Sequence, residues 1–153
     1  HEIDPNNPAY KKAIGHQANA EQILSDEGLY FSSVANDFNP IQAAAIRSLE
    51  IKPWWLIPPE HLNYFTISSI SRFYEEGGFV ILDKRTSFPI DLFLLMGINY
   101  VEAPKLGTQC HEWRVNIENA LKQSGFESLF NSMCVTNAKI GIGRQADIIG
   151  RKK

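Results

Sequence analysis

Residues 79–102, FVILDKRTSFPIDLFLLMGINYVE, decide the fold that this sequence predicts. The first four residues form a continuous apolar run that is short and β-branched enough to be a buried strand. A second apolar segment covers 88–95, the Met-Gly pair at 96–97 is typical of a tight turn, and residues 98–102 alternate as a strand does. The stretch therefore predicts three consecutive strands, the last two joined as a hairpin.

Helices are predicted on both sides of these strands. Apolar residues recur close to the helical period over 59–76, and a Gly-Gly pair ends that pattern. After the hairpin, the sequence predicts a helix over 107–125 and short strands at 133–135 and 139–142. The order from residue 59 onward is helix, strand, strand, strand, helix, strand. We therefore expect a mixed α/β (α+β) fold with a central mixed sheet flanked by helices.

The first 58 residues are predicted to form an N-terminal extension. The pattern predicts a helix over 9–27 and a short strand over 29–34. Asn39-Pro40 opens a second helix, because proline is favoured at the first helical position. An apolar segment at 51–57 follows and is closed by two prolines.

The composition is that of one ordinary globular domain. The chain has 153 residues, of which 44% are hydrophobic and 21% are charged, enough to bury a core. We divide it into the extension at 1–58, a core at 59–142 and a basic tail at 143–153. Two cysteines exclude a scaffold of several disulfides. The apolar runs are far shorter than the roughly 20 residues of a membrane span, and the opening residues lack a signal-peptide pattern. We therefore expect a soluble domain that is cut from a longer chain or is a processed chain.

The charge is unevenly distributed along the chain. The formal net charge is −2, which argues against a globally basic nucleic-acid coat. From residue 139 onward, five basic residues stand against a single aspartate, a net charge of +4 that leaves −6 for the rest. The segment 143–150, GRQADIIG, with its glycines and basic neighbours, predicts a loop that contacts phosphates. The basic residues that we expect to bind nucleic acid are Lys139, Arg144, Arg151 and Lys152.

Two carboxylates and a lysine form the candidate catalytic site. In the predicted hairpin, Asp91 near the far end of one strand lies beside Glu102 and Lys105 on the partner strand. Two carboxylates in an otherwise apolar hairpin repel each other, and a hard cation such as Mg²⁺ or Mn²⁺ relieves that repulsion. A nearby lysine can orient or deprotonate a water and stabilise charge that develops on a phosphate. These residues predict metal-assisted cleavage of a phosphodiester bond.

Over about half of the chain, the sequence resembles the PD-(D/E)XK nuclease superfamily, whose core has the same order of helix, three strands, helix and strand. In that family an aspartate begins the second core strand, and an acidic residue and a lysine follow on the third. The resemblance assigns these roles to Asp91, Glu102 and Lys105, and that of the metal-binding helix glutamate to Glu76 or Glu75. It implies a metal-dependent nuclease acting on DNA or RNA, such as a toxin or effector module, with Mg²⁺ or Mn²⁺ as cofactor.

The spacing departs from the family's pattern at the lysine. Lys105 follows Glu102 by three residues rather than two, and Pro104 occupies the intermediate place. The alternation of a strand puts Pro104 on the face of Glu102. The site therefore requires a bulge, or the end of the strand at Pro104, to turn Lys105 back.

Two other functions stay open at this stage. A protein-interaction domain would use its aromatic residues, because Trp54 and Trp55 are adjacent, point to opposite faces of a strand and leave one indole for a partner. An α/β enzyme that acts on a small molecule is the third interpretation. A thiol hydrolase is disfavoured, since Cys110 and His111 are adjacent on a helix and point about 100° apart.

Overall fold

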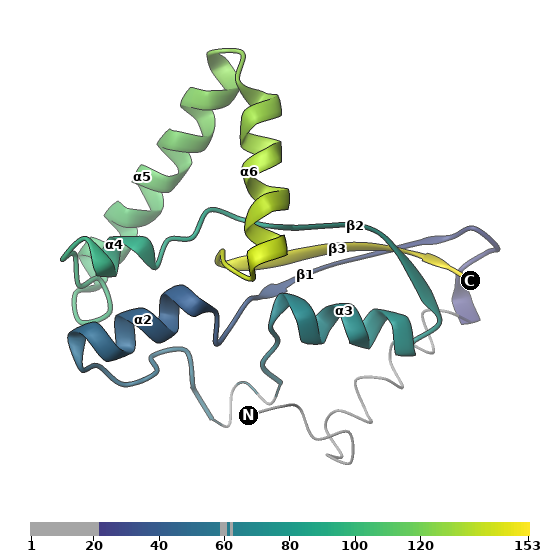
Figure 1. The fold of residues 1–153 in the computed structure, drawn as a ribbon, viewed down its shortest axis with the longest axis horizontal. Coiled ribbons are helices and arrows are strands. Elements are labelled where there is room, and N and C mark those ends of the chain that lie inside the picture. Colours follow the sequence, from purple (N-terminus) through teal and green to yellow (C-terminus); the bar gives the residue numbers. More distant parts are fainter. Residues whose placement is uncertain (1–21, 59–60, 62) are drawn as a thin grey trace.

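A computed structural model describes residues 22–58, 61 and 63–153. The described strands form an antiparallel sheet in the order β1-β3-β2, and they are β1 (Leu29–Ala35), β2 (Phe79–Thr86) and β3 (Gln145–Lys152). The described helices are α2 (Pro40–Leu49), α3 (Ile67–Glu76), α4 (Leu92–Leu95), α5 (Pro104–Gln123) and α6 (Glu127–Ile140). The mixed α+β class predicted from the sequence is confirmed (Figure 1).

One face of the sheet carries the hydrophobic core. Along β3, Ala146 and Ile148 are fully buried and alternate with more exposed residues, as the period of a strand requires. They pack against α3, where Tyr74 is fully buried and its hydroxyl donates to Ser32 on β1 over 2.7 Å. A Cβ at Gly150 would lie 2.6 Å from Tyr74 Cδ1. Glycine at this position of β3 therefore allows α3 to pack closely on the sheet.

Helices α5 and α6 form a helical hairpin that extends away from the sheet (Figure 1). Gly125, with a φ of +82°, makes the turn between them. Cys134 and Ala138 are the buried residues of α6, and Ala138 joins the hydrophobic core, so the base of this helix is fixed to the sheet. Within the described ranges, no helix is both long and apolar enough to cross a membrane.

The predicted hairpin over 88–102 is absent, and the predicted order of the core is wrong. After β2, backbone N–H groups bond to carbonyls two or three residues back, and α4 follows. An apolar run of eight residues fits a buried helical turn as well as a strand, and Pro89 removes a donor that a strand ladder needs. Residues 98–102 contain no strand. From α3 onward the order is helix, strand, three helices and strand, and the sheet is antiparallel rather than mixed.

The segment predicted as a basic tail, 143–153, contains the central strand β3. The glycines of this segment predicted a loop. The structure has a tight turn just before β3, in which Gly141 and Gly143 have φ values of +79° and +112°. The strands predicted at 133–135 and 139–142 are also wrong, because these residues lie in α6 or in the turn that ends it. Burial four residues apart on α6 follows the helical period, which such short segments do not reveal.

The first part of the chain agrees with the sequence in two elements. β1 and α2 lie where the pattern predicts them. The helix predicted over 59–76 begins only at Ile67, because Thr66 caps it: the Thr66 hydroxyl accepts from the Ser69 backbone, and the Ser69 hydroxyl accepts from the Thr66 backbone. Most of the helix predicted over 9–27 lies outside the described residues.

Candidate functional site

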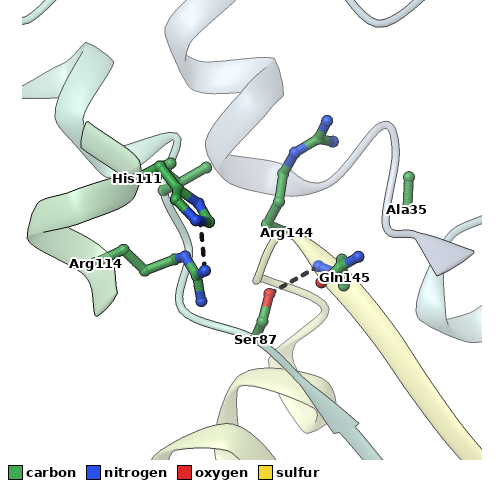
Figure 2. Close-up of a pocket in the computed structure, with 7 residues that line it drawn as sticks. Ala35, Ser87, His111, Arg114, Arg144 and Gln145 are labelled. Carbon is green, nitrogen blue, oxygen red and sulfur yellow. Dashed lines mark hydrogen bonds between the residues drawn. The ribbon is translucent and has the colours of Figure 1, made fainter. Parts of the chain in front are cut away.

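A cavity lies at the end of the sheet where β1 and β2 end and β3 begins. β1 ends at Ala35, which pairs with Gln145 at the start of β3, and Thr86 at the end of β2 pairs with Ala146. The cavity has a volume of about 270 Å³ and lies between these strand ends and α5 (Figure 2). It is lined by Ala35, Ser87, Ile90, His111, Arg114, Arg144 and Gln145. We refer to it as the basic cavity.

A tight turn before β3 sets the position of Arg144. Gly143 has a φ of +112°, and a Cβ there would lie 2.5 Å from Thr86 Cβ, so glycine is required. The Asn36 side chain donates to the carbonyls of Gly141 and Gly143 over 3.1 and 3.0 Å. The Thr86 hydroxyl donates to another carbonyl of the same turn over 2.6 Å. Because the turn is held by Asn36, which follows β1, and by Thr86 of β2, Arg144 leads into β3 in a fixed direction.

Three nitrogen-bearing side chains line the basic cavity from two elements. His111 and Arg114 lie one turn apart on α5, and Arg144 comes from the start of β3 (Figure 2). Arg114 Nη1 donates to Glu118 over 2.6 Å, and its Nη2 lies 3.3 Å from His111 Nδ1. Glu118 thus orients Arg114, while a guanidinium has five N–H donors and keeps others for a ligand. The arrangement suits an anionic group.

Arg144 also forms an ion pair with a buried carboxylate. Its Nη1 lies 3.6 Å from Oδ1 of Asp37, which is close enough for an ion pair and too long for a hydrogen bond. Both atoms are buried, and neither has a hydrogen-bond partner among the described residues. Burial raises the pKa of Asp37, and the charge of Arg144 opposes that rise. The pair leaves hydrogen-bonding capacity unused beside the basic cavity.

Asp91, the predicted catalytic aspartate, lies in the same polar region. It is 1% exposed, and its carboxylate accepts hydrogen bonds from the Tyr100 hydroxyl and the Asn39 amide. Burial and then the charge of Asp91 raise the pKa of Tyr100, while the charge of Arg144 lowers it. Burial and the charge of Asp91 likewise raise the pKa of Asp37. We refer to Asp37, Asn39, Asp91, Tyr100 and Arg144 as the polar cluster.

The other predicted metal and catalytic residues do not join Asp91. Asp91 is buried at the start of α4, whereas Glu102 and Lys105 are exposed, just before α5 and in its first turn. Glu76 lies at the other end of β2, a strand of eight residues that spans roughly 25 Å. The described residues contain no group of three His, Cys, Asp or Glu side chains that could hold a metal ion. Binding of Mg²⁺ or Mn²⁺ stays a prediction.

Of the four basic residues predicted to bind nucleic acid, Arg144 lines the basic cavity. Arg151, near the other end of β3, donates to Glu27 over 2.9 Å, and Lys152 donates to a backbone carbonyl over 3.1 Å. Lys139 is exposed in the last turn of α6. Arg144 and Arg151 stand about 23 Å apart along the extended chain. The four residues therefore do not form one continuous basic strip.

The sequence patterns did not single out His111, Arg114 or Asp37 as site residues. A signal for the first two existed, because residues three apart on a predicted helix share a face. Asp37 carried no such signal: an aspartate just before Asn39-Pro40 is typical of a turn that leads into a helix. Its role depends on Arg144, which lies far along the chain.

The two tryptophans pack on each other instead of pointing to opposite faces of a strand. The chain makes a turn at Trp54 and Trp55, whose rings are 4.7 Å apart and nearly perpendicular. Trp55 is 5% exposed and also contacts Phe38, and Trp54 contacts Tyr100. The strand prediction was wrong because Pro53 lacks a ladder donor and favours a turn. The pair covers the polar cluster at Tyr100 and leaves the buried indole of Trp55 closed to a partner.

Comparisons of the chain with protein-family models, curated proteins and solved structures found no match. The resemblance to PD-(D/E)XK nucleases therefore rests on the sequence pattern alone, and the described residues do not contain the run of three consecutive strands on which that pattern depends. Function has to be inferred from the basic cavity and the polar cluster.

Proposed function

We propose that this domain binds nucleic acid and holds one phosphodiester group in the basic cavity. The observation that carries this proposal is that Arg114, Arg144 and His111 line the same cavity. In Figure 2 the side chains of Arg114 and His111 point toward each other, whereas the guanidinium of Arg144 points away from them. Guanidinium groups recognise phosphate through paired N–H donors, which supply charge and geometry together. Arg114 supplies such donors from α5, and Arg144 adds a second positive charge to the lining of the site.

The size of the basic cavity fits part of a nucleic acid. Its volume of about 270 Å³ lies just below the range of about 300 to 1,000 Å³ for sites that enclose a drug-sized ligand. Because the formal net charge of the chain is −2, attraction to phosphate has to be local. We therefore expect few phosphate contacts and a shallow salt dependence of binding.

The state of Arg144 adds support beyond its charge. Its buried Nη1 faces Asp37 at 3.6 Å without a hydrogen bond in the described part of the chain. Buried donors of this kind are normally satisfied by protein, water or ligand. Asp37 keeps the guanidinium in place, and the other N–H donors of Arg144, whose side chain is 39% exposed, remain for a phosphate oxygen.

Fluorescence anisotropy with labelled single-stranded DNA, single-stranded RNA and duplex DNA tests this function. We expect Arg114→Gln and Arg144→Gln each to weaken binding about tenfold, and to reduce the slope of log affinity against log salt by about one. Arg72→Gln is the matched control, because Arg72 is exposed on α3, which does not line the cavity. Absence of binding by the wild type, or equal affinity of all folded variants, would refute the proposal.

Cleavage of the bound phosphodiester is a second candidate function. It is favoured by Asp91, which lies in the polar cluster, where it and Arg144 both act on Tyr100. Asp91 does not itself line the basic cavity, but Ile90, its neighbour in the chain, does. A carboxylate close to a bound phosphate can activate water or contribute to a divalent-cation site.

The cleavage assay uses plasmid, single-stranded DNA and total tRNA with Mg²⁺ or Mn²⁺. We expect cleavage that a chelator and Asp91→Asn both abolish, and that the exposed control Asp26→Asn retains. Cleavage by a folded Asp91→Asn variant would reject the role of Asp91. Binding without cleavage under all conditions would leave nucleic-acid binding as the function.

A further inference from the structure

A second cavity lies beside the ion pair between Asp37 and Arg144. It has a volume of about 330 Å³ and is lined by Val34, Ala35, Asp37, His61, Asn63 and Phe65. Ala35 lines the basic cavity as well. Of the two groups in the ion pair, 3.6 Å apart, Arg144 lines the basic cavity and Asp37 lines the second one. The two cavities are therefore neighbours, and we refer to the second as the acidic cavity.

Asp37 contributes a carboxylate to the lining of the acidic cavity. The residue is 4% exposed, and its Oδ1 has no hydrogen-bond partner in the described ranges. Burial raises the pKa of Asp37 and the charge of Asp91 adds to that rise, whereas the charges of Arg144 and His61 and a hydrogen bond with the Gln42 side chain oppose it. A buried carboxylate oxygen without a donor is unfavourable. The cavity is thus complementary to a ligand that brings N–H donors.

The other walls of the acidic cavity suit a flat ring. Val34, Ala35 and Phe65 supply apolar surface, and the Phe65 ring is held at 5.6 Å from Phe73. His61 contributes a ring nitrogen that can donate or accept. A volume of about 330 Å³ is at the small end of ligand sites, which fits one planar heterocycle.

We propose that the acidic cavity binds a guanine base of the strand whose phosphate lies in the basic cavity. Guanine presents two adjacent donors, N1–H and the N2 amine, to the carboxylate of Asp37, and its O6 and N7 acceptors remain for His61 or Asn63. Adenine and cytosine place an acceptor nitrogen next to their amino group, which a carboxylate repels. Single-stranded nucleic acid exposes this edge of the base. The inference rests on the proposed function, because the phosphate site anchors the strand.

Short single-stranded oligonucleotides that differ at one base provide the first test. The probes are labelled thymidine hexamers with one central guanine, inosine, adenine or cytosine, and inosine lacks only the N2 amine of guanine. We expect the guanine probe to bind at least about fivefold more tightly than the other three, as a good bidentate contact discriminates between bases. Equal affinity for the guanine and inosine probes would overturn the inference.

Variants of the acidic cavity provide the second test. We expect Asp37→Asn to abolish the preference for guanine, and Asp147→Asn to retain it, because Asp147 is a half-buried carboxylate that lines neither cavity. His61→Ala should reduce the preference, so a test remains if Asp37→Asn does not fold. A preference that survives in the folded variants overturns the inference. Binding that needs Arg114 and Arg144 but ignores the base refutes this inference alone, whereas no binding of any probe refutes the proposed function.

Discussion

The two ends of β3 carry arginine–carboxylate ion pairs of opposite character. At one end Arg151 donates to Glu27 over 2.9 Å, and the two side chains are 43% and 77% exposed. At the other end Arg144 lies 3.6 Å from Asp37, and the two side chains are 39% and 6% exposed, so the two pairs differ in the burial of their carboxylates. The shorter contact is expected to matter less, because exposed pairs contribute about 0–1 kcal/mol, whereas leaving a buried charge unpaired costs several kcal/mol.

Burial rather than distance therefore decides what each pair can do. Water completes the hydrogen bonding of Arg151 and Glu27 without any ligand. The atoms of Asp37 and Arg144 that face each other are shielded from water and have no hydrogen-bond partner in the described part of the chain. This contrast is in line with the proposal that the end of the sheet where β3 begins binds nucleic acid.

At the Arg144 end of β3, we expect the largest loss of stability from a substitution in the turn before the strand. Gly143→Ala puts a Cβ 2.5 Å from Thr86 at a φ of +112°, so we expect a loss of about 3 kcal/mol in the free energy of unfolding. Gly141→Ala is the control: with a φ of +79° and no atom within 4 Å, it should lose about 1 kcal/mol. Urea unfolding measures both, and equal losses would contradict a tight contact between the turn and β2.

Removing Arg144 should have the next largest effect. We expect Arg144→Gln to lower the free energy of unfolding by about 1–2 kcal/mol at pH 7, because Asp37 then stays buried without its counter-charge. Adding Asp37→Asn should restore part of that loss, since the double variant has no unpaired charge. Urea unfolding of the single and double variants gives the coupling. Purely additive losses would mean that the two groups do not interact.

Titration of Asp37 should make stability depend on pH, with a smaller effect than the loss of Arg144. Burial raises the pKa of Asp37 above its ordinary value of 3.8, so the folded state holds the proton more tightly than the unfolded chain. The resulting stabilisation is complete below the unfolded pKa and is lost as the pH rises through the folded pKa. We expect wild type to lose stability relative to Asp37→Asn from pH 4 to pH 7. A relative gain would show that Arg144 outweighs burial.

The exposed pair should give the smallest effect. Arg151→Gln should change the free energy of unfolding by less than about 0.5 kcal/mol, because the pair with Glu27 is solvated. Its affinity for nucleic acid should equal that of wild type, since Arg151 lies far from the basic cavity. Urea unfolding and anisotropy measure the two quantities. A loss as large as that of Arg144→Gln would remove the contrast between the two ends.

The sequence predicted correctly those elements that are specified by residues within the element or next to it. Asn39-Pro40 marks the start of α2, the apolar run at 79–82 marks β2, and the helical period marks α5. The run at 88–95 fits a strand and a buried helix equally well, and the choice depends on whether a partner strand exists. β2 pairs instead with β3. The sequence pattern had predicted a loop and tail in place of β3, because glycines lie in and around this segment.

The site was predictable only in part, for the same reason. Asp91 and Arg144 were picked from the sequence, and both lie in the polar cluster, but with partners other than those predicted. Asp37 was not predicted because its environment comes from segments that are remote in the chain. The shared face of His111 and Arg114 could have been recognised from their spacing.

The place of β3 between β1 and β2 has a consequence for synthesis on the ribosome. Neither earlier strand pairs with the other, and each bonds to the strand that is translated after both of them. The nascent chain therefore carries two open strand edges, which are prone to aggregation, until β3 emerges. Arg144 and Gln145 are translated last among the residues that line the basic cavity, so this cavity is completed only in the last, long-range step of folding, the kind of contact that forms slowly.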